Sequence, residues 1–148
     1  MEINYRKCDY DDVDFILDLK DLCIRWYIEI IYGWDYDVQR KNTIQELNHH
    51  IDGIRIMLDE DKPIGVTTFY EEDGNYIVGL IALHPDYQGQ GIGSEILSKY
   101  IEKAKDDRKK IYIKAYKGNP ARLLYERLGF KKYREDDTHV YSLIDFSI

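Results

Sequence analysis

The stretch from residue 83 to residue 94 constrains the fold of this chain more than any other segment. An apolar run over residues 77–83 ends just before a proline, and the chain then passes through Gly89, Gly91 and Gly93 into an amphipathic segment. This order predicts a strand, a tight loop and the N-terminus of a helix. Such a loop can direct several backbone N–H groups at one anionic group, and the helix dipole adds to the attraction. We therefore expect an anion-binding loop suited to a phosphorylated cofactor.

The spacing of the glycines separates three kinds of phosphate-binding loop. A dinucleotide-binding loop has the pattern Gly-x-Gly-x-x-Gly, whereas here glycine recurs at every second position. A nucleotide P-loop ends in Lys-Ser or Lys-Thr, but Ser94 is followed by Glu95. The spacing Gln88-x-x-Gly91-x-Gly93 resembles the acyl-CoA pyrophosphate loop of the GNAT superfamily of N-acetyltransferases. For the loop taken alone, a turn whose glycines serve only the chain reversal stays an alternative.

A second segment, residues 119–130, resembles the same superfamily. Asn119 is a favoured N-cap residue, Pro120 fits the first position of a helix, and Gly129 suits its left-handed end. The predicted short helix contains Tyr125 and is followed by Gly-Phe. An Asn, a short helix with an inner Tyr and then Gly-Phe resemble the GNAT pattern, and the two segments occur in the family's order. Together they make the resemblance strong.

The alternation of predicted elements favours an α/β fold. We expect strands over residues 3–8, 54–58, 64–71, 76–83, 110–116, 130–134 and 139–146. We expect helices over residues 9–31, 35–49, 91–104 and 119–128. About seven strands and four helices match the GNAT fold, a mixed and mostly antiparallel sheet whose two central parallel strands splay apart. Because no linker or internal repeat divides the sequence, a single domain over residues 1–148 is expected.

Composition and charge restrict the partners of this chain. The formal net charge is −7, which argues against binding to nucleic acid or an anionic membrane, because either would need a basic patch. No apolar run reaches membrane-spanning length, and residues 1–3 read as the start of a strand rather than as a leader. Cys8 and Cys23 fit a reducing compartment as buried, inert thiols, and neither belongs to a metal-binding cluster. We therefore expect a cytoplasmic protein with no metal and no nucleic-acid or membrane partner.

The resemblance implies acetyl-CoA as the acyl donor. The pantetheine arm would lie between the two splayed strands along the backbone of Ile81, Ala82 and Leu83, with the Leu83 N–H near the thioester carbonyl. The Asn119 side chain would contact the same arm. The pyrophosphate would bind backbone N–H groups of Gln88, Gly89, Gln90, Gly91, Ile92, Gly93 and Ser94.

The resemblance also implies direct transfer of the acetyl group to a primary amine. Tyr125 matches the family's proton donor to the leaving thiolate of coenzyme A, although one of fourteen tyrosines can also be a core aromatic. Many relatives place a Glu on one of the splayed strands as the base, yet here Ile77 and Ile113 stand near that position. A base that acts through water is then expected. Its candidate terminal acids, each of which can also be a solvated residue, are Glu71, Glu72 and Asp35.

The first two helices and the loop between them are expected to select the acceptor. Trp34, Asp35 and Tyr36 place aromatic surface and a carboxylate in a small region, which suits an amine-bearing ligand, although Trp34 can instead pack the helices onto the sheet. The acceptor is a small molecule or a peptide, and a homodimer is compatible with the family. Two other functions stay open. One is a noncatalytic acyl-CoA-binding sensor, which the missing base favours, and the other is an acetyltransferase for protein N-termini or lysines.

Overall fold

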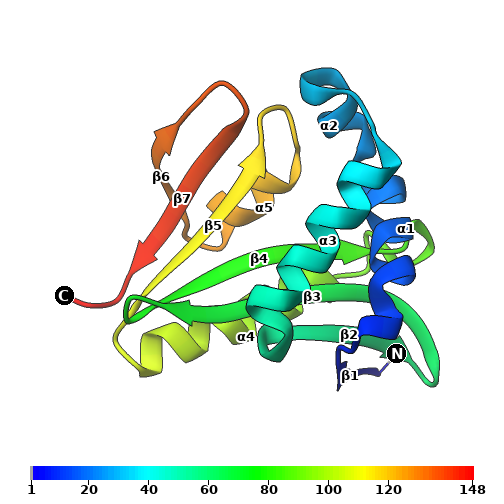
Figure 1. Cartoon of the computed structure of the whole chain (residues 1–148). Helices are drawn as coiled ribbons and strands as arrows, with labels where there is room; N and C mark the ends of the chain where they lie inside the picture. The colour runs from blue at the N-terminus through cyan, green and yellow to red at the C-terminus, as the bar shows by residue number, and fades with distance from the viewer. Residues whose placement is uncertain (1) are drawn as a thin grey trace. The chain divides into compact units, whose positions relative to one another are not determined.

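The structure is a computed structural model that describes residues 2–148. Met1, the first residue of the expected domain and of the segment expected to be a strand rather than a leader, lies outside the described residues. Seven strands form one sheet in the order β1-β2-β3-β4-β5-β7-β6 (Figure 1). They are β1 (Ile3–Lys7), β2 (Ile54–Asp59), β3 (Lys62–Glu72), β4 (Asn75–Leu83), β5 (Lys110–Tyr116), β6 (Lys131–Glu135) and β7 (His139–Asp145). The α-helices of the described chain are α1 (Val13–Cys23), α2 (Arg25–Tyr32), α3 (Tyr36–His50), α4 (Ile92–Asp106) and α5 (Ala121–Arg127). Short 3₁₀ helices are η1 (Tyr10–Asp12), η2 (Ile51–Gly53) and η3 (Pro85–Tyr87).

The predicted α/β class and the mixed, mostly antiparallel sheet are confirmed. β1 and β2, β2 and β3, β5 and β7, and β6 and β7 pair antiparallel. β4 and β5 are the parallel neighbours, paired at Tyr76 with Ile111 and at Ile77 with Tyr112. Both pairs lie near the N-terminal ends of the two strands.

The predicted number of four helices is wrong, because residues 2–148 contain five. The segment expected as one long helix is interrupted between α1 and α2 at Ile24, whose φ of −127° and ψ of −5° are not helical. The Ile24 N–H still bonds to the Lys20 carbonyl at 2.9 Å, so α1 closes its last turn before the backbone departs. A β-branched side chain such as that of Ile24 lowers helix propensity only slightly. The apolar pattern of the sequence continues across Ile24, so the pattern does not predict the break.

The chain divides into two compact units. The first comprises residues up to Thr68 together with 80–92, and the second comprises 69–79 together with 93–148. β3 and β4 contribute residues to both. The expectation of a single domain over residues 1–148 stays a prediction.

In the first unit, α1 and α3 lie side by side against one face of the strands (Figure 1). Ile16 and Leu47 from these helices are buried with Ile56 of β2 in one apolar cluster. A separate cluster contains Leu83, the last residue of β4, and Ile92, the first residue of α4. Because Leu83 and Ile92 are buried in one apolar cluster, the loop over residues 84–91 is anchored at both ends.

In the second unit, β5, β7 and β6 form an antiparallel ribbon with α5 beside it (Figure 1). Along β5, Ile111 and Ile113 are buried, while Tyr112 and Lys114 alternate with them on the other face. The β6–β7 register shifts between Lys132 and Arg134, which marks a bulge in β6. The face of this unit that carries α4 is packed by aromatic stacking of Phe69 on Tyr100, with ring centroids 4.0 Å apart.

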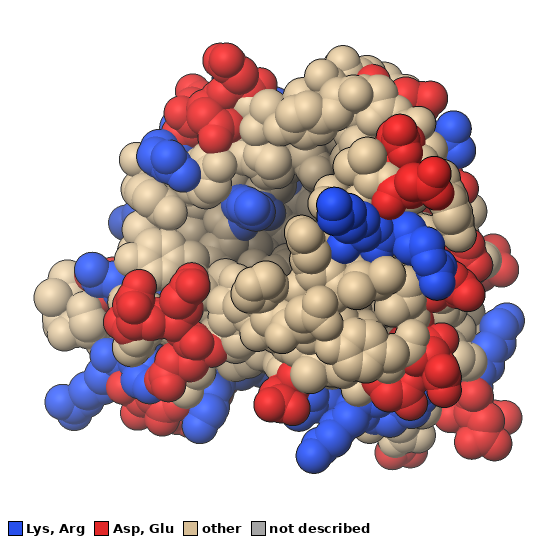
Figure 2. All heavy atoms as spheres, in the orientation of Figure 1, with Lys and Arg blue, Asp and Glu red and all other residues tan. Residues whose placement is uncertain are grey.

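Charged side chains are interspersed on the molecular surface. On the face of the molecule drawn in Figure 2, Lys and Arg are interspersed with Asp and Glu and form no continuous basic patch. Among residues 2–148, no helix is both long and apolar enough to cross a bilayer.

Candidate functional site

The loop between β4 and α4 has the backbone that the sequence predicts for an anion-binding loop. Gly89 has φ of +75° and Gly91 has φ of +83°. An L side chain in this region costs roughly 1–2 kcal/mol, so glycine is needed at both positions. A Cβ atom built on Gly89, Gly91 or Gly93 would meet no atom within 4 Å. The space beside the loop is therefore open to a ligand.

Side chains hold this loop to its own strand. The Gln88 Nε2 donates to the Leu83 carbonyl at 2.9 Å, and the Gln90 Nε2 donates to the Asp86 carbonyl at 3.1 Å. The Gln88 N–H donates to the Pro85 carbonyl at 3.2 Å, so it is already bonded inside η3. By contrast, the N–H groups at the start of α4 have no acceptor within the helix, as at any helix N-terminus. These groups are the ones available to an anion.

The C-terminal end of β4 directs a backbone N–H away from β3. The His84 N–H donates to the Ile64 carbonyl of β3 at 2.8 Å. The preceding carbonyl, that of Leu83, instead accepts from Gln88 and from the Cys23 thiol, whose Sγ lies 3.2 Å away. Since the N–H and C=O of one strand residue project to the same side, the Leu83 N–H also points away from β3.

Cys23 contacts this strand end, a contact that no sequence pattern predicts. The residue ends α1, and its thiol lies beside Leu83, 60 positions further along the chain. Burial raises the pKa of the Cys23 thiol, which keeps it protonated. The prediction of a buried thiol holds only in part, because Cys23 is half-buried; its contact with Leu83 adds a role in anchoring the end of β4.

Tyr125 lies on α5 and is half-buried. Its ring meets Phe130 edge to face, with centroids 6.1 Å apart. Burial raises the pKa of the phenol above its usual value, so the hydroxyl keeps its proton. Within residues 2–148 this hydroxyl has no hydrogen-bond partner in the protein. A protonated, unpartnered phenol is free to donate to a bound ligand.

The start of α5 differs by one residue from the prediction. Pro120, not Asn119, is the N-cap, and α5 begins at Ala121. The Asn119 Oδ1 nevertheless accepts from the Ala121 N–H, two residues further along the chain, at 2.9 Å, which is a hydrogen bond that a capping side chain makes. The amide NH₂ of Asn119 is the part of that side chain left for a ligand. Gly129 has φ of +110°, as expected for a residue just beyond a helix end.

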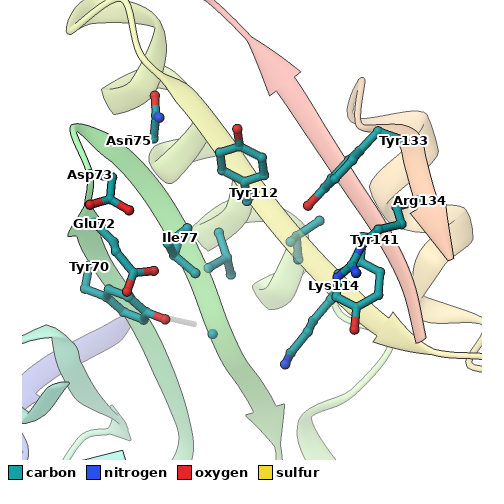
Figure 3. A pocket seen from close by; sticks show the side chains of 13 residues that line it. Tyr70, Glu72, Asp73, Asn75, Ile77, Tyr112, Lys114, Tyr133, Arg134 and Tyr141 are labelled. Atoms are coloured by element: carbon teal, nitrogen blue, oxygen red, sulfur yellow. The ribbon is translucent and has the colours of Figure 1, made fainter. Parts of the chain in front are cut away.

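The second unit contains a cavity of about 410 Å³ (Figure 3). Figure 3 shows Glu72 and Asp73 on one side of it and Lys114 and Arg134 on the other. The lining residues are Tyr70, Glu72, Asp73, Asn75, Ile77, Val78, Gly79, Tyr112, Ile113, Lys114, Tyr133, Arg134 and Tyr141. Ile77 and Ile113, which stand near the position expected for a catalytic Glu, both belong to this lining.

Alternation along β3 separates two of the predicted acids. Phe69 stacks on Tyr100 and Glu71 forms an ion pair with Lys109, which assigns Phe69 and Glu71 to one face. Glu72 lies on the other face and lines the cavity. In the described chain, Glu72 is in no salt bridge. The structure therefore brings Glu72 to the cavity and leaves Glu71 away from it.

Five residues that the sequence did not predict as site residues also line the cavity: Tyr112, Lys114, Tyr133, Arg134 and Tyr141. The bulge in β6 lets two successive residues, Tyr133 and Arg134, line the same cavity. The Arg134 guanidinium lies 4.0 Å from the centre of the Tyr141 ring. The Tyr112-x-Lys114 alternation was a usable signal, whereas the bulge and the register were not visible in the sequence.

Trp34, Asp35 and Tyr36 lie in the first unit, where α2 gives way to α3. Asp35 is the N-cap of α3, and its Oδ1 accepts from the Val38 N–H at 3.1 Å. The Arg25 guanidinium lies 5.3 Å from the centre of the Trp34 ring. The carboxylate and the indole therefore have partners within the protein, while Tyr36 is 54% exposed. Their role in acceptor binding stays a prediction.

A family model described as an acetyltransferase (GNAT) domain matches residues 51–132. The chain belongs to the GNAT acetyltransferase family. The L-amino acid N-acyltransferase MnaT of Escherichia coli (strain K12) is 30% identical over 89 residues, or 53% of this chain. That match spans about half, 51%, of the length of the Escherichia coli protein.

Solved GNAT structures share the fold over nearly the whole chain. The PaiA N-acetyltransferase from Thermoplasma acidophilum, solved in complex with coenzyme A, is 17% identical with a TM-score of 0.79 and covers 98% of this chain and 99% of that one. The ribosomal-protein-S18-alanine N-acetyltransferase from Escherichia coli is 16% identical with a TM-score of 0.69, and the match covers 99% of this chain and 96% of that one. At these identities the likeness establishes the fold. In residues 2–148, no group of three or more His, Cys, Asp and Glu side chains is arranged to hold a metal ion.

Proposed function

We propose that this protein transfers the acetyl group of acetyl-CoA to a primary amine. One observation carries the proposal: Gly89 and Gly91 have the left-handed backbone of an anion-binding loop, with open space beside them and the N-terminus of α4 directly after. Membership of the GNAT family and the coenzyme A bound to the PaiA relative support it. The proposal keeps the cytoplasmic location and the absence of nucleic-acid and membrane partners that the composition predicts.

The described residues offer suitable groups for this donor. N–H groups from Gly89 to Gly93 would hold the pyrophosphate, and the amide NH₂ of Asn119 would contact the pantetheine arm. When bound, acetyl-CoA supplies a thioester whose acetyl group is activated for transfer. The Leu83 N–H would hydrogen-bond the thioester oxygen, and one such donor in a site that excludes water contributes roughly 3 kcal/mol to catalysis.

Tyr125 would hold the proton that the departing sulfur needs. The usual pKa of a phenol is near 10 and that of a thiol near 8.5, so this transfer is uphill by about 2 kcal/mol. Burial raises the pKa of Tyr125 and makes the step somewhat harder. The placement of Tyr125 and its lack of a competing hydrogen bond must therefore matter more than its acidity.

Glu72 would accept the proton of the attacking amine through a bridging water. It lines the cavity, whereas Glu71 is held by Lys109 and Asp35 caps α3. A carboxylate that acts through one water is within the usual reach of general-base catalysis.

The test combines calorimetric binding of acetyl-CoA with release of free thiol in the presence of an amine panel. The proposal expects binding and turnover with at least one amine class, whether free amine or peptide. Tight binding without turnover of any amine would favour a noncatalytic sensor, a function consistent with the absence of ionisable side chains in residues 77–83. Absence of binding would refute both.

A further inference from the structure

We propose that the cavity of the second unit selects an acceptor that carries an anionic group close to its amine. This inference rests on the proposed acetyltransferase function and names the class of acceptor. Lys114 and Arg134 would bind the anion, and Glu72 would face the amine.

The charges that line this cavity are separated by sign and are not neutralised by each other. Lys114 and Arg134 lie on one side and Glu72 and Asp73 on the other (Figure 3). None of these four is in a salt bridge with another residue of the described chain. Some other cations of the same unit do have such partners, as Lys132 does in Glu135 at 3.1 Å. A ligand with one positive and one negative group would satisfy both sides of the cavity.

The strand register places the two cations on either side of one ring. Lys114 is opposite Tyr141 in the β5–β7 pair, and Arg134 is opposite Tyr141 in the β6–β7 pair. Neighbouring strands are about 4.8 Å apart, so the two Cα atoms lie roughly 10 Å apart with Tyr141 between them. Long side chains can converge over this distance on one carboxylate or phosphate. The Arg134 guanidinium, 4.0 Å from the Tyr141 ring centre, is held ready for a bidentate contact.

Neighbouring groups do not compete for the anion. Burial lowers the pKa of His139, and the positive charge of Lys114 lowers it further. His139 is therefore neutral near pH 7, which leaves Lys114 and Arg134 as the cations of this wall.

Size and lining favour a small acceptor with an apolar part. A cavity of about 410 Å³ falls in the usual range for small-molecule sites. Tyr112 and Tyr133, in edge-to-face contact with ring centroids 5.8 Å apart, add aromatic surface to the lining. A polyamine, which carries only positive charge, would meet two cations that no carboxylate of the described chain neutralises. The geometry points to a compact amino acid with an apolar or aromatic side chain, or an equivalent aminophosphate.

The test compares phenylalanine with phenethylamine, which share the ring and the amine and differ in the carboxylate. We expect kcat/KM to favour phenylalanine by roughly 10-fold or more, as for a charged hydrogen bond. Lys114→Met and Arg134→Met should each raise KM for phenylalanine roughly 10-fold to 100-fold and should not raise KM for phenethylamine. Lys131→Met is the matched control, because it removes the same charge from an exposed β6 position outside the cavity. The kcat/KM for 2-aminoethyl phosphate is measured as well, and its comparison with the value for phenylalanine shows whether the preferred anionic group is a phosphate or a carboxylate.

Equal kcat/KM for phenylalanine and phenethylamine in the wild-type protein, or a preference for spermidine over all anionic acceptors, would overturn the inference and leave the proposed function intact. Turnover of no acceptor would overturn the proposed function instead. In that case, calorimetric titration of N-acetylphenylalanine and N-acetylphenethylamine into protein saturated with coenzyme A still decides charge selection. The inference is supported if N-acetylphenylalanine binds more tightly than N-acetylphenethylamine and if this difference is lost in Lys114→Met and kept in Lys131→Met. Equal binding of the two compounds to the wild-type protein refutes it.

Discussion

Gly91→Ala should abolish most acetyl-CoA binding and should also lower the stability of the protein. Gly74→Ala should lower the stability by a similar amount but leave acetyl-CoA binding unchanged. Gly91 has φ of +83° and Gly74 has φ of +80°, and a Cβ at either position would meet no atom within 4 Å. Each Ala variant therefore carries the same backbone strain, roughly 1–2 kcal/mol. For a chain of this length, 1 kcal/mol shifts Tm by about 2–4 °C, so both melting temperatures should fall by similar amounts.

The two variants should differ in ligand binding. The methyl group on Gly91 would enter the space beside the loop and separate the pyrophosphate from at least one N–H donor. A hydrogen bond to a charged group is worth about 1.5–3 kcal/mol, so the acetyl-CoA Kd should rise roughly 10-fold to 100-fold. Gly74 belongs to the β3–β4 turn and not to this loop, and its variant should keep the wild-type Kd. Calorimetry gives Kd and circular dichroism gives Tm. Wild-type affinity in Gly91→Ala, or equal weakening in Gly74→Ala, would refute the placement of the pyrophosphate.

Three further predictions concern Tyr125, the pair Glu72 and Glu71, and Asp12. Tyr125→Phe should lower kcat roughly 100-fold or more and leave the calorimetric Kd for acetyl-CoA unchanged, and an unchanged kcat would remove Tyr125 from the mechanism. Glu72→Gln should lower kcat by a similar factor while Glu71→Gln stays near wild type, and the reverse order in a thiol-release assay would show that Glu71 is the base. Two hydrogen bonds from Arg6 hold the pKa of Asp12 below its usual 3.8, so the stability from this pair is complete above that value and is lost as the pH falls through the lowered pKa. Asp12→Asn should accordingly lower the free energy of unfolding by about 2 kcal/mol at neutral pH and by less near pH 3 in urea titrations, whereas an equal effect at both values would contradict this sign.

The order of strands and helices was predictable because its signals are local. Apolar alternation marks the strands, and glycines with positive φ mark the loop before α4 and the end of α5. Ile24 shows the limit of such signals, since the break between α1 and α2 falls inside an unbroken amphipathic pattern. At Asn119 the signal was local, since its side chain accepts from the Ala121 N–H although the helix is assigned from Ala121.

The cavity was less predictable because strand pairing brings its residues together. Glu71 and Glu72 are equivalent in the sequence, and the packing on each face of β3 is what separates them. The pairing of Lys114 and Arg134 around Tyr141 depends on the register of three strands and on one bulge. Such non-local features leave no periodic signature in the chain.

The most direct test of the central claim is mass spectrometry of amine acceptors incubated with the wild-type protein and acetyl-CoA, with free thiol followed in the same samples. The account predicts an acceptor that gains one acetyl group for each coenzyme A released, and that this product nearly disappears with Tyr125→Phe. Thiol release without an acetylated amine, or no acetylated product from any acceptor, would contradict it.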